Sequence, residues 1–108
     1  MKRGDLVVVA ARRVYTGKPR PALVVQSDLF NEVHASITIC PVTSEMVDAG
    51  LFRIPLPPGS RTGLDTPSHV MVDKIVSVPR SAINRIIGQA AGNEMDAVSA
   101  ALVHWLDV

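Results

Sequence analysis

The sequence predicts a small, strongly bent, mostly β barrel with one helix near its C-terminal end. Short apolar runs rich in β-branched residues recur along the chain, and clusters containing glycine, proline or polar residues separate them. Helical spacing of apolar residues distinguishes the last segment from the others. With 108 residues, the chain is expected to form a single domain spanning residues 1–108.

The first two predicted strands flank a polar loop. Residues 6–10 are apolar and largely β-branched, which favours a strand. Residues 11–19 are polar and include glycine and proline, so we expect a loop there. Residues 22–26 are almost entirely apolar, which predicts a second strand in the centre of the sheet.

The middle of the chain predicts three more strands and one short extended piece. Residues 27–35 are expected to form a turn, and residues 37–40 a strand that ends at the following proline. Residues 52–56 alternate and contain a proline, which suits an edge strand. Residues 69–78 form the longest strand candidate, whereas residues 86–87 predict only a short extended piece or a turn.

A helix is predicted over the last sixteen residues. Asn93 is a suitable N-cap, and Glu94 and Asp96 are acidic residues favoured in a first turn. The apolar residues at helical spacing are expected to pack against the sheet, and they are Met95, Val98, Leu102, Trp105 and Leu106.

Composition excludes several classes of protein. No run of about twenty apolar residues is present, so we expect no membrane span, and no signal peptide is evident at the start. The single Cys40 cannot form an internal disulfide, which fits a reducing compartment, and we expect it in the core rather than as a nucleophile.

Charge is unevenly distributed along the chain. The formal net charge is +1, but residues 1–20 carry six lysine and arginine residues against one aspartate, a net of +5. A basic end on a nearly neutral chain indicates a local site for an anionic partner such as nucleic acid or an acidic protein. A solvated charged loop explains the charge equally well.

Arg20 is the most informative candidate for a functional side chain. Pro19 and Pro21 flank it, just before the apolar run of the second predicted strand. Proline fixes its own φ and biases the preceding residue towards extended backbone, so Arg20 is expected to be held extended at the end of a rigid strand. A backbone constrained in this way suits an arginine whose guanidinium must bind a phosphate or carboxylate.

The chain resembles the MazF/PemK toxin family over nearly its whole length. The residues that carry the resemblance occur in the family's order and lie at 3–7, 18–25, 41–44, 63–64, 72–75, and at Gly88 followed by the 95–102 helix. The resemblance implies an SH3-like, CcdB-type barrel and a homodimeric, metal-independent, sequence-selective endoribonuclease. It also implies a cytoplasmic toxin without a cofactor, whose cognate antitoxin covers the RNA-binding surface with an acidic segment and forms a DNA-binding complex with it.

The resemblance also implies roles for individual residues. Arg20 matches the family's catalytic arginine and Thr43 its catalytic threonine, although Thr43 could instead simply close a turn with Ser44. Metal-free cleavage uses the adjacent 2′-hydroxyl as nucleophile, so we expect Arg20 to stabilise charge on the phosphorane. The general base remains open, because no family motif places a histidine at His34 or His69, and a third histidine lies in the predicted helix.

The remaining candidates are expected to contact RNA. Asp73 matches an acidic residue of the family, but the next residue is lysine where glutamine is common, and Asp73 could instead form a salt bridge. Tyr15 could stack on an unpaired base or fill a hydrophobic gap in its loop. The other predicted RNA-binding residues are Arg12, Arg13, Lys18, Ser44 and Lys74.

Two alternatives use the same barrel. A CcdB-like poison of DNA gyrase needs a particular aromatic and glycine tail, which residues 105–108 match poorly. A non-catalytic SH3-like module would bind RNA or protein and cut nothing.

Overall fold

The computed structural model describes residues 1–10, 18–46 and 50–108 of the chain. Within them, seven strands form one antiparallel sheet with the order β4-β5-β3-β2-β1-β7, and β6 pairs with β3 outside this path. The strands are β1 (Asp5–Val9), β2 (Arg20–Val24), β3 (Ser36–Thr43), β4 (Arg53–Leu56), β5 (Ser68–Met71), β6 (Val76–Pro79) and β7 (Ile83–Gln89).

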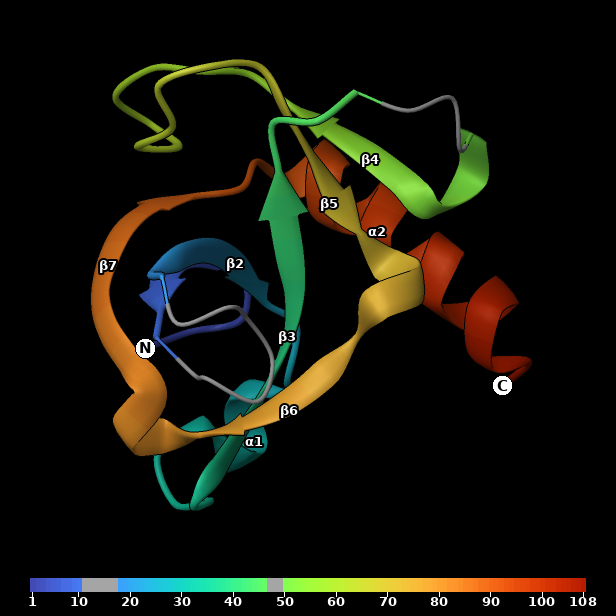
Figure 1. Cartoon of the computed structure of the whole chain (residues 1–108). Coiled ribbons are helices and arrows are strands. Elements are labelled where there is room, and N and C mark those ends of the chain that lie inside the picture. Colours follow the sequence, from blue (N-terminus) through green and yellow to red (C-terminus); the bar gives the residue numbers. More distant parts are fainter. Residues whose placement is uncertain (11–17, 47–49) are drawn as a thin grey trace.

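The sheet bends strongly around the core but does not close (Figure 1). The predicted mainly β fold with a C-terminal helix is confirmed, whereas the described strands form an open sheet instead of a complete barrel. The central position of β2, between β1 and β3, and the edge position of β4 are both as predicted. Pro55 is tolerated in β4 because an edge strand has one side without a ladder partner.

Strand β3 is longer than predicted and continues through Pro41 to Thr43. Residues 36–39 of β3 pair with β6, and residues 42–43 pair with β5. Pro41 therefore lies where β3 changes partner along this edge, which is where a residue without an N–H disturbs the ladder least.

The predicted long strand over residues 69–78 is wrong, because a 3₁₀ turn over Val72–Lys74 divides it into β5 and β6. Both halves pair with the same edge of β3, and the turn between them forms the corner of the bend. The predicted short piece at residues 86–87 is instead the seven-residue β7, which pairs with β1 through two register shifts that let it curve. The predicted turn over residues 27–35 contains a short helix, α1 (Asp28–Asn31).

Helix α2 (Gly92–Leu106) covers one side of the sheet, as Figure 1 shows. It begins two residues earlier than predicted: its N-cap is Ala91 instead of Asn93, and the Glu94 carboxylate accepts a 2.6 Å hydrogen bond from the Ala91 N–H. Val98 and Ala101 are fully buried against the sheet, but Trp105 and Leu106 are about half exposed, so the predicted packing face stops short of the helix end.

Candidate functional site

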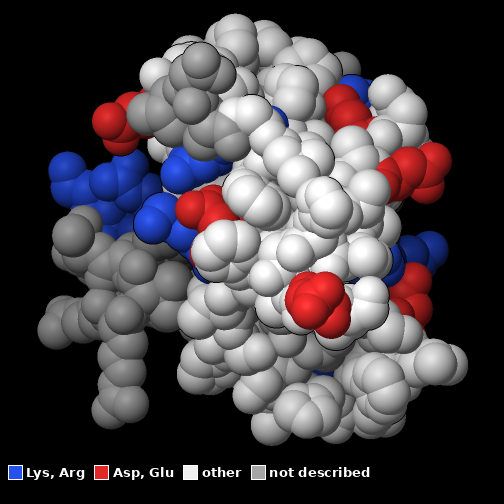
Figure 2. Space-filling view, turned by 90° about the vertical axis from the view of Figure 1, so that its right-hand side faces the viewer, with Lys and Arg blue, Asp and Glu red and all other residues white. Residues whose placement is uncertain are grey.

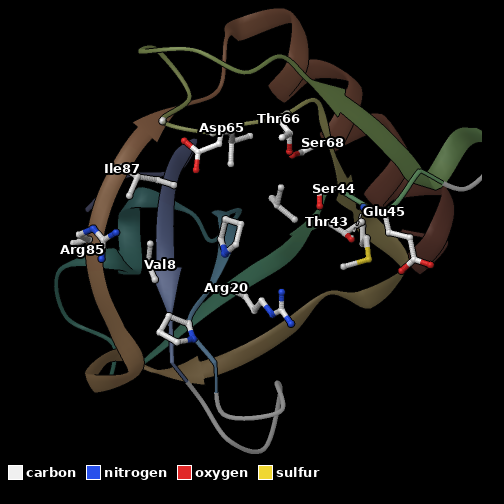
Figure 3. Close-up of a pocket in the computed structure, with 16 residues that line it drawn as sticks. Val8, Arg20, Thr43, Ser44, Glu45, Asp65, Thr66, Ser68, Arg85 and Ile87 are labelled. Carbon is white, nitrogen blue, oxygen red and sulfur yellow. Dashed lines mark hydrogen bonds between the residues drawn. The ribbon is translucent and has the colours of Figure 1, made fainter.

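An open cavity of about 810 Å³ lies at one end of the bent sheet (Figure 3). Its walls come from strands β1, β2, β3, β5 and β7 and from the loop that precedes β5. The residues that line it are Val8, Pro19, Arg20, Pro21, Val42, Thr43, Ser44, Glu45, Gly63, Leu64, Asp65, Thr66, Ser68, Met71, Arg85 and Ile87.

Arg20 occupies the position that its flanking prolines predict. It is the first residue of β2, it is exposed, and Pro19 and Pro21 line the cavity beside it. In Figure 3 its guanidinium points towards the side of the cavity that carries Thr43. Arg20 forms no ion pair with any described residue, so the N–H groups of its guanidinium are available to bind an anion.

Thr43 ends β3 and lines the same cavity as Arg20. Its Oγ1 accepts a 3.0 Å hydrogen bond from the backbone N–H of Glu45, so the residue does close the turn after β3. Because the hydroxyl acts as acceptor in this bond, its own hydrogen remains free to donate to a phosphate oxygen. Turn closure and phosphate contact are therefore compatible roles for Thr43.

Three charged residues in the cavity were missed from the sequence. Arg85 comes from β7, Glu45 follows β3, and Asp65 belongs to the loop before β5. Figure 3 places Arg85 on a different wall from Thr43. The cavity thus combines two guanidinium groups with two carboxylates, which can bind an anion and also transfer protons.

Two glycines hold the loop that carries Asp65 against β7. A Cβ on Gly63 would lie 2.1 Å from the Ile87 carbonyl oxygen, and Gly63 has a φ of +72°. A Cβ on Gly88 would lie 2.3 Å from the Thr62 backbone. This close approach of two backbones excludes other residues and fixes the wall of the cavity opposite Thr43.

The other predicted RNA-binding residues fall into three groups. Ser44 lines the cavity, whereas Lys18, Asp73 and Lys74 do not. Arg12, Arg13 and Tyr15 lie outside the described residues. Their predicted contacts with RNA stay predictions.

Asp73 lies in the 3₁₀ turn between β5 and β6, where its Oδ1 is 3.7 Å from Arg53 Nε. This ion pair is the structural alternative that the sequence analysis allowed for Asp73.

Neither the histidines nor the cysteine contributes a nucleophile or base to the cavity. His34, His69 and His104 are absent from its lining. Cys40 is fully buried in the core, and burial raises the pKa of its thiol to about 12. At neutral pH this thiol is protonated, as expected of a core cysteine.

The fold and the cavity define a class of protein: a small, mainly β domain in which a bent, open sheet and a C-terminal helix accompany a cavity lined by arginine and threonine side chains. The family model of the PemK-like, MazF-like toxin of type II toxin-antitoxin systems matches residues 2–106. The chain therefore belongs to this toxin family.

Relatives cover the full length of the chain. It is 44% identical over 108 residues to the probable endoribonuclease MazF of Mycolicibacterium smegmatis, which covers 100% of this chain and 98% of that protein. The MazE–MazF structure (form I) from Deinococcus radiodurans matches with a TM-score of 0.80 and 27% identity, covering 100% and 97% of the two chains.

A mycobacterial endoribonuclease in complex with its cognate antitoxin has the same fold, with a TM-score of 0.84 at 17% identity over 100% of this chain and 96% of that chain. None of these comparisons supports the gyrase-poison or non-catalytic alternatives. Among the helices described here, none is both long and apolar enough to cross a membrane.

Proposed function

We propose that this toxin is a sequence-selective endoribonuclease that cuts single-stranded mRNA without a metal ion and thereby stops growth. The observation that carries the proposal is the joint presence of Arg20 and Thr43 in one open cavity, with Arg20 in no ion pair with another described residue. Action on mRNA would place the protein in the cytoplasm. The endoribonuclease named among its relatives supports this reading.

The reaction is a transesterification within the RNA. The 2′-oxygen attacks the adjacent phosphorus as its proton leaves, and the bond from phosphorus to the 5′-oxygen breaks. The products are a 2′,3′-cyclic phosphate and a 5′-hydroxyl, which takes up a proton. Arg20 binds the non-bridging oxygens, where charge develops, and Thr43 donates its hydroxyl hydrogen to the same phosphate.

Proton transfer needs a base and an acid close to the phosphate. The described lining of the cavity offers two carboxylates, Glu45 and Asp65, as bases. Glu45 follows Thr43 by two residues, and its backbone N–H donates to the Thr43 hydroxyl. Arg20 is a poor base, because an arginine guanidinium keeps its proton in proteins, and its role is electrostatic.

A homodimer and an antitoxin complex belong to the same proposal. Figure 2 shows a broad face with few charged groups on the side of the molecule that carries α2. The end of α2 exposes apolar side chains, including Trp105 at 46% and Leu106 at 49% exposure. Such a patch suits burial against a second copy, and a monomer by light scattering at micromolar concentration would contradict it.

The cognate antitoxin is proposed to lay an acidic segment over the cavity and its basic surroundings. Arg20 and Arg85 line the cavity, and the exposed Lys18 precedes β2. These cations would attract carboxylates as well as phosphates, so antitoxin and RNA would compete for one surface.

One experiment separates the three functions. The purified protein is incubated in EDTA with a long RNA, and separately with gyrase and plasmid DNA. We expect RNA fragments with cyclic phosphate and 5′-hydroxyl ends, and no fragments with folded Arg20→Ala or Thr43→Ala protein. Gyrase-linked DNA breaks with intact RNA would identify a gyrase poison, and RNA binding without either reaction would identify a non-catalytic module.

A further inference from the structure

An ion pair links helix α2 to the loop between β4 and β5. The Arg61 guanidinium donates two hydrogen bonds to the Glu94 carboxylate, of 2.8 Å from Nη1 to Oε1 and 3.2 Å from Nη2 to Oε2. The Glu94 side chain is only 12% exposed, and the other two ion pairs between described groups are longer, at 3.7 and 4.0 Å. Two parallel hydrogen bonds fix the orientation of both partners, so this pair can hold two elements together.

Arg61 also joins the loop to the end of β7. Its Nη1 donates a 3.1 Å hydrogen bond to the Gln89 carbonyl oxygen, and its own carbonyl oxygen accepts a 2.8 Å hydrogen bond from the Gln89 N–H. Beside this contact the backbones of the loop and of β7 touch at Gly63 and Gly88. Arg61 therefore connects the loop, the end of β7 and the beginning of α2.

Buried contacts anchor the residues between Arg61 and the cavity. Thr62 is 1% exposed, and its hydroxyl donates a 2.7 Å hydrogen bond to the Pro57 carbonyl oxygen. The same hydroxyl accepts a 3.3 Å hydrogen bond from the Leu64 N–H, and Leu64 is part of the buried core. The position of Arg61 is therefore transmitted along a short, anchored stretch of backbone to Leu64.

Asp65 directly follows this stretch and lines the cavity together with Leu64 and Thr66. On its other side, the Ser68 hydroxyl donates a 3.0 Å hydrogen bond to the Thr66 carbonyl oxygen. Asp65 is exposed, and its carboxylate forms no ion pair with any described residue. A carboxylate whose backbone is held on both sides while its oxygens stay free is suited to act on a bound substrate.

We propose that Arg61 and Glu94 are positioning residues: their ion pair holds Asp65 where its carboxylate accepts the proton that the RNA 2′-hydroxyl loses. This inference rests on the proposed endoribonuclease function, in which Asp65 is one of two candidate bases. Neither Arg61 nor Glu94 lines the cavity, so both act through the loop. A displacement of about 1 Å can cost on the order of a hundredfold in rate, so the pair influences catalysis without contacting RNA.

The kinetics of RNA cleavage in EDTA test this positioning role. Arg61→Gln and Glu94→Gln each break the ion pair, and glutamine at position 94 still offers an oxygen to the Ala91 N–H. We expect each variant to lose about tenfold in kcat with little change in KM, because proton transfer occurs in the transition state. The variant with both changes should be no slower than either single variant. An unchanged kcat, or losses that multiply, would overturn the proposal.

Asp65→Asn shows whether the ion pair acts through this carboxylate. Alone, this change should lower kcat by on the order of a hundredfold, as expected for the loss of a base. Adding Arg61→Gln to Asp65→Asn should cause no further loss, because no carboxylate is left to be positioned. A further tenfold loss, or cleavage at the wild-type rate by Asp65→Asn, would show that the pair does not work through Asp65.

Ser99→Ala is the matched control for a general loss of stability. It removes a 2.8 Å hydrogen bond between α2 and Arg3, and neither of these residues lines the cavity. We expect this variant to unfold at a lower urea concentration than the wild type and to keep the wild-type kcat. A fall in kcat as large as that of Arg61→Gln would mean that any weakening of α2 has this effect, and the positioning role would be lost.

Hydrogen exchange separates failure of the ion pair from failure of the enzyme. The N–H groups of Gly63 and Gln89 are bonded within and to the loop, and NMR follows their exchange in the wild type and Arg61→Gln. Both should exchange about tenfold faster in the variant, while exchange in β1, β2 and β3 stays unchanged. If the wild type cuts no RNA, the proposed function fails, yet this pattern still supports the hold of the ion pair on the loop. Unchanged exchange at both groups would overturn it.

Discussion

Arg20 and Thr43 line one cavity from neighbouring strands, Arg20 as the first residue of β2 and Thr43 as the last residue of β3. The ladder between these strands pairs Ala22 with Pro41, each of them two residues from the site. We expect the long guanidinium and the short hydroxyl to reach two oxygens of one phosphate, as the proposed cleavage mechanism needs.

Replacement of Arg85 tests whether the second guanidinium of the cavity binds RNA phosphate. We expect Arg85→Ala to weaken RNA binding to a similar extent for all sequences, because a phosphate contact carries no base information. The slope of log affinity against log salt should fall in magnitude by about 0.7, the value for one phosphate of a single strand. Fluorescence anisotropy with labelled RNA at several salt concentrations measures both quantities.

Asn84 supplies the control for this prediction, since it precedes Arg85 in β7, is exposed and does not line the cavity. Asn84→Ala should leave affinity and salt slope unchanged. A normal slope in Arg85→Ala would show that this arginine meets no phosphate.

The thiol of Cys40 is predicted to be unreactive in the folded protein. Burial raises its pKa from the ordinary 9.0 to about 12, so very little thiolate exists at pH 8, and the side chain is also closed off from reagents. Iodoacetamide at pH 8 should leave the folded protein unmodified and should label one thiol after unfolding in urea, as followed by mass spectrometry. Rapid labelling of the folded protein would contradict this placement.

Glu94 is predicted to stabilise the fold in a pH-dependent way. Burial alone would raise the pKa of Glu94, but hydrogen bonds from Arg61 and from the Ala91 N–H outweigh it and lower the pKa below its ordinary 4.5. A lowered pKa in the folded state stabilises the protein above the ordinary pKa, and this contribution is lost as the pH falls through the folded value. At acid pH, the contribution of Glu94 to the stability of the fold should therefore be lost.

Urea denaturation of the wild type and Glu94→Gln at several pH values checks this predicted loss of stability with falling pH. At pH 7 the variant should be less stable by about 1 kcal/mol, because a charged hydrogen bond at the start of α2 is lost. The difference should shrink as the pH falls from about 4.5 through the lower pKa of the folded state, below which Glu94 is neutral as well. A difference that stays constant from pH 7 to pH 3 would refute the linkage.

Individual sequence segments predict most of the strands, the C-terminal helix and one of the two proposed catalytic residues, Arg20. The proline pair around Arg20 predicts an arginine fixed at a strand end, and the structure has it there. Thr43 has no such local signal, because a threonine before serine is common in turns, and its role came from resemblance alone. Its place in the same cavity as Arg20 depends on the pairing of two strands, which the sequence of either strand does not specify.

Non-local geometry explains what could not be predicted. Ile86 is 52% exposed, so buried and exposed side chains do not alternate regularly along β7. For this reason the sequence analysis did not identify β7 as a full strand or Arg85 as a residue of the cavity. Asp65 reaches the cavity only because Gly63 and Gly88 let a loop touch β7. The division of the predicted long strand at Val72–Lys74 likewise follows from β3 changing its partner, which neither segment reveals alone.

A double-mutant cycle at Arg20 and Thr43 tests the central claim most directly. Cleavage rates of one RNA are measured in EDTA for the wild type, Arg20→Ala, Thr43→Ala and the double variant, each shown to be folded. If both side chains act on one phosphate, each single change should cost on the order of a hundredfold, and the double variant should be little slower than the slower single variant. Losses that simply multiply in the double variant, or an Arg20→Ala protein that cuts at the wild-type rate, would contradict this account.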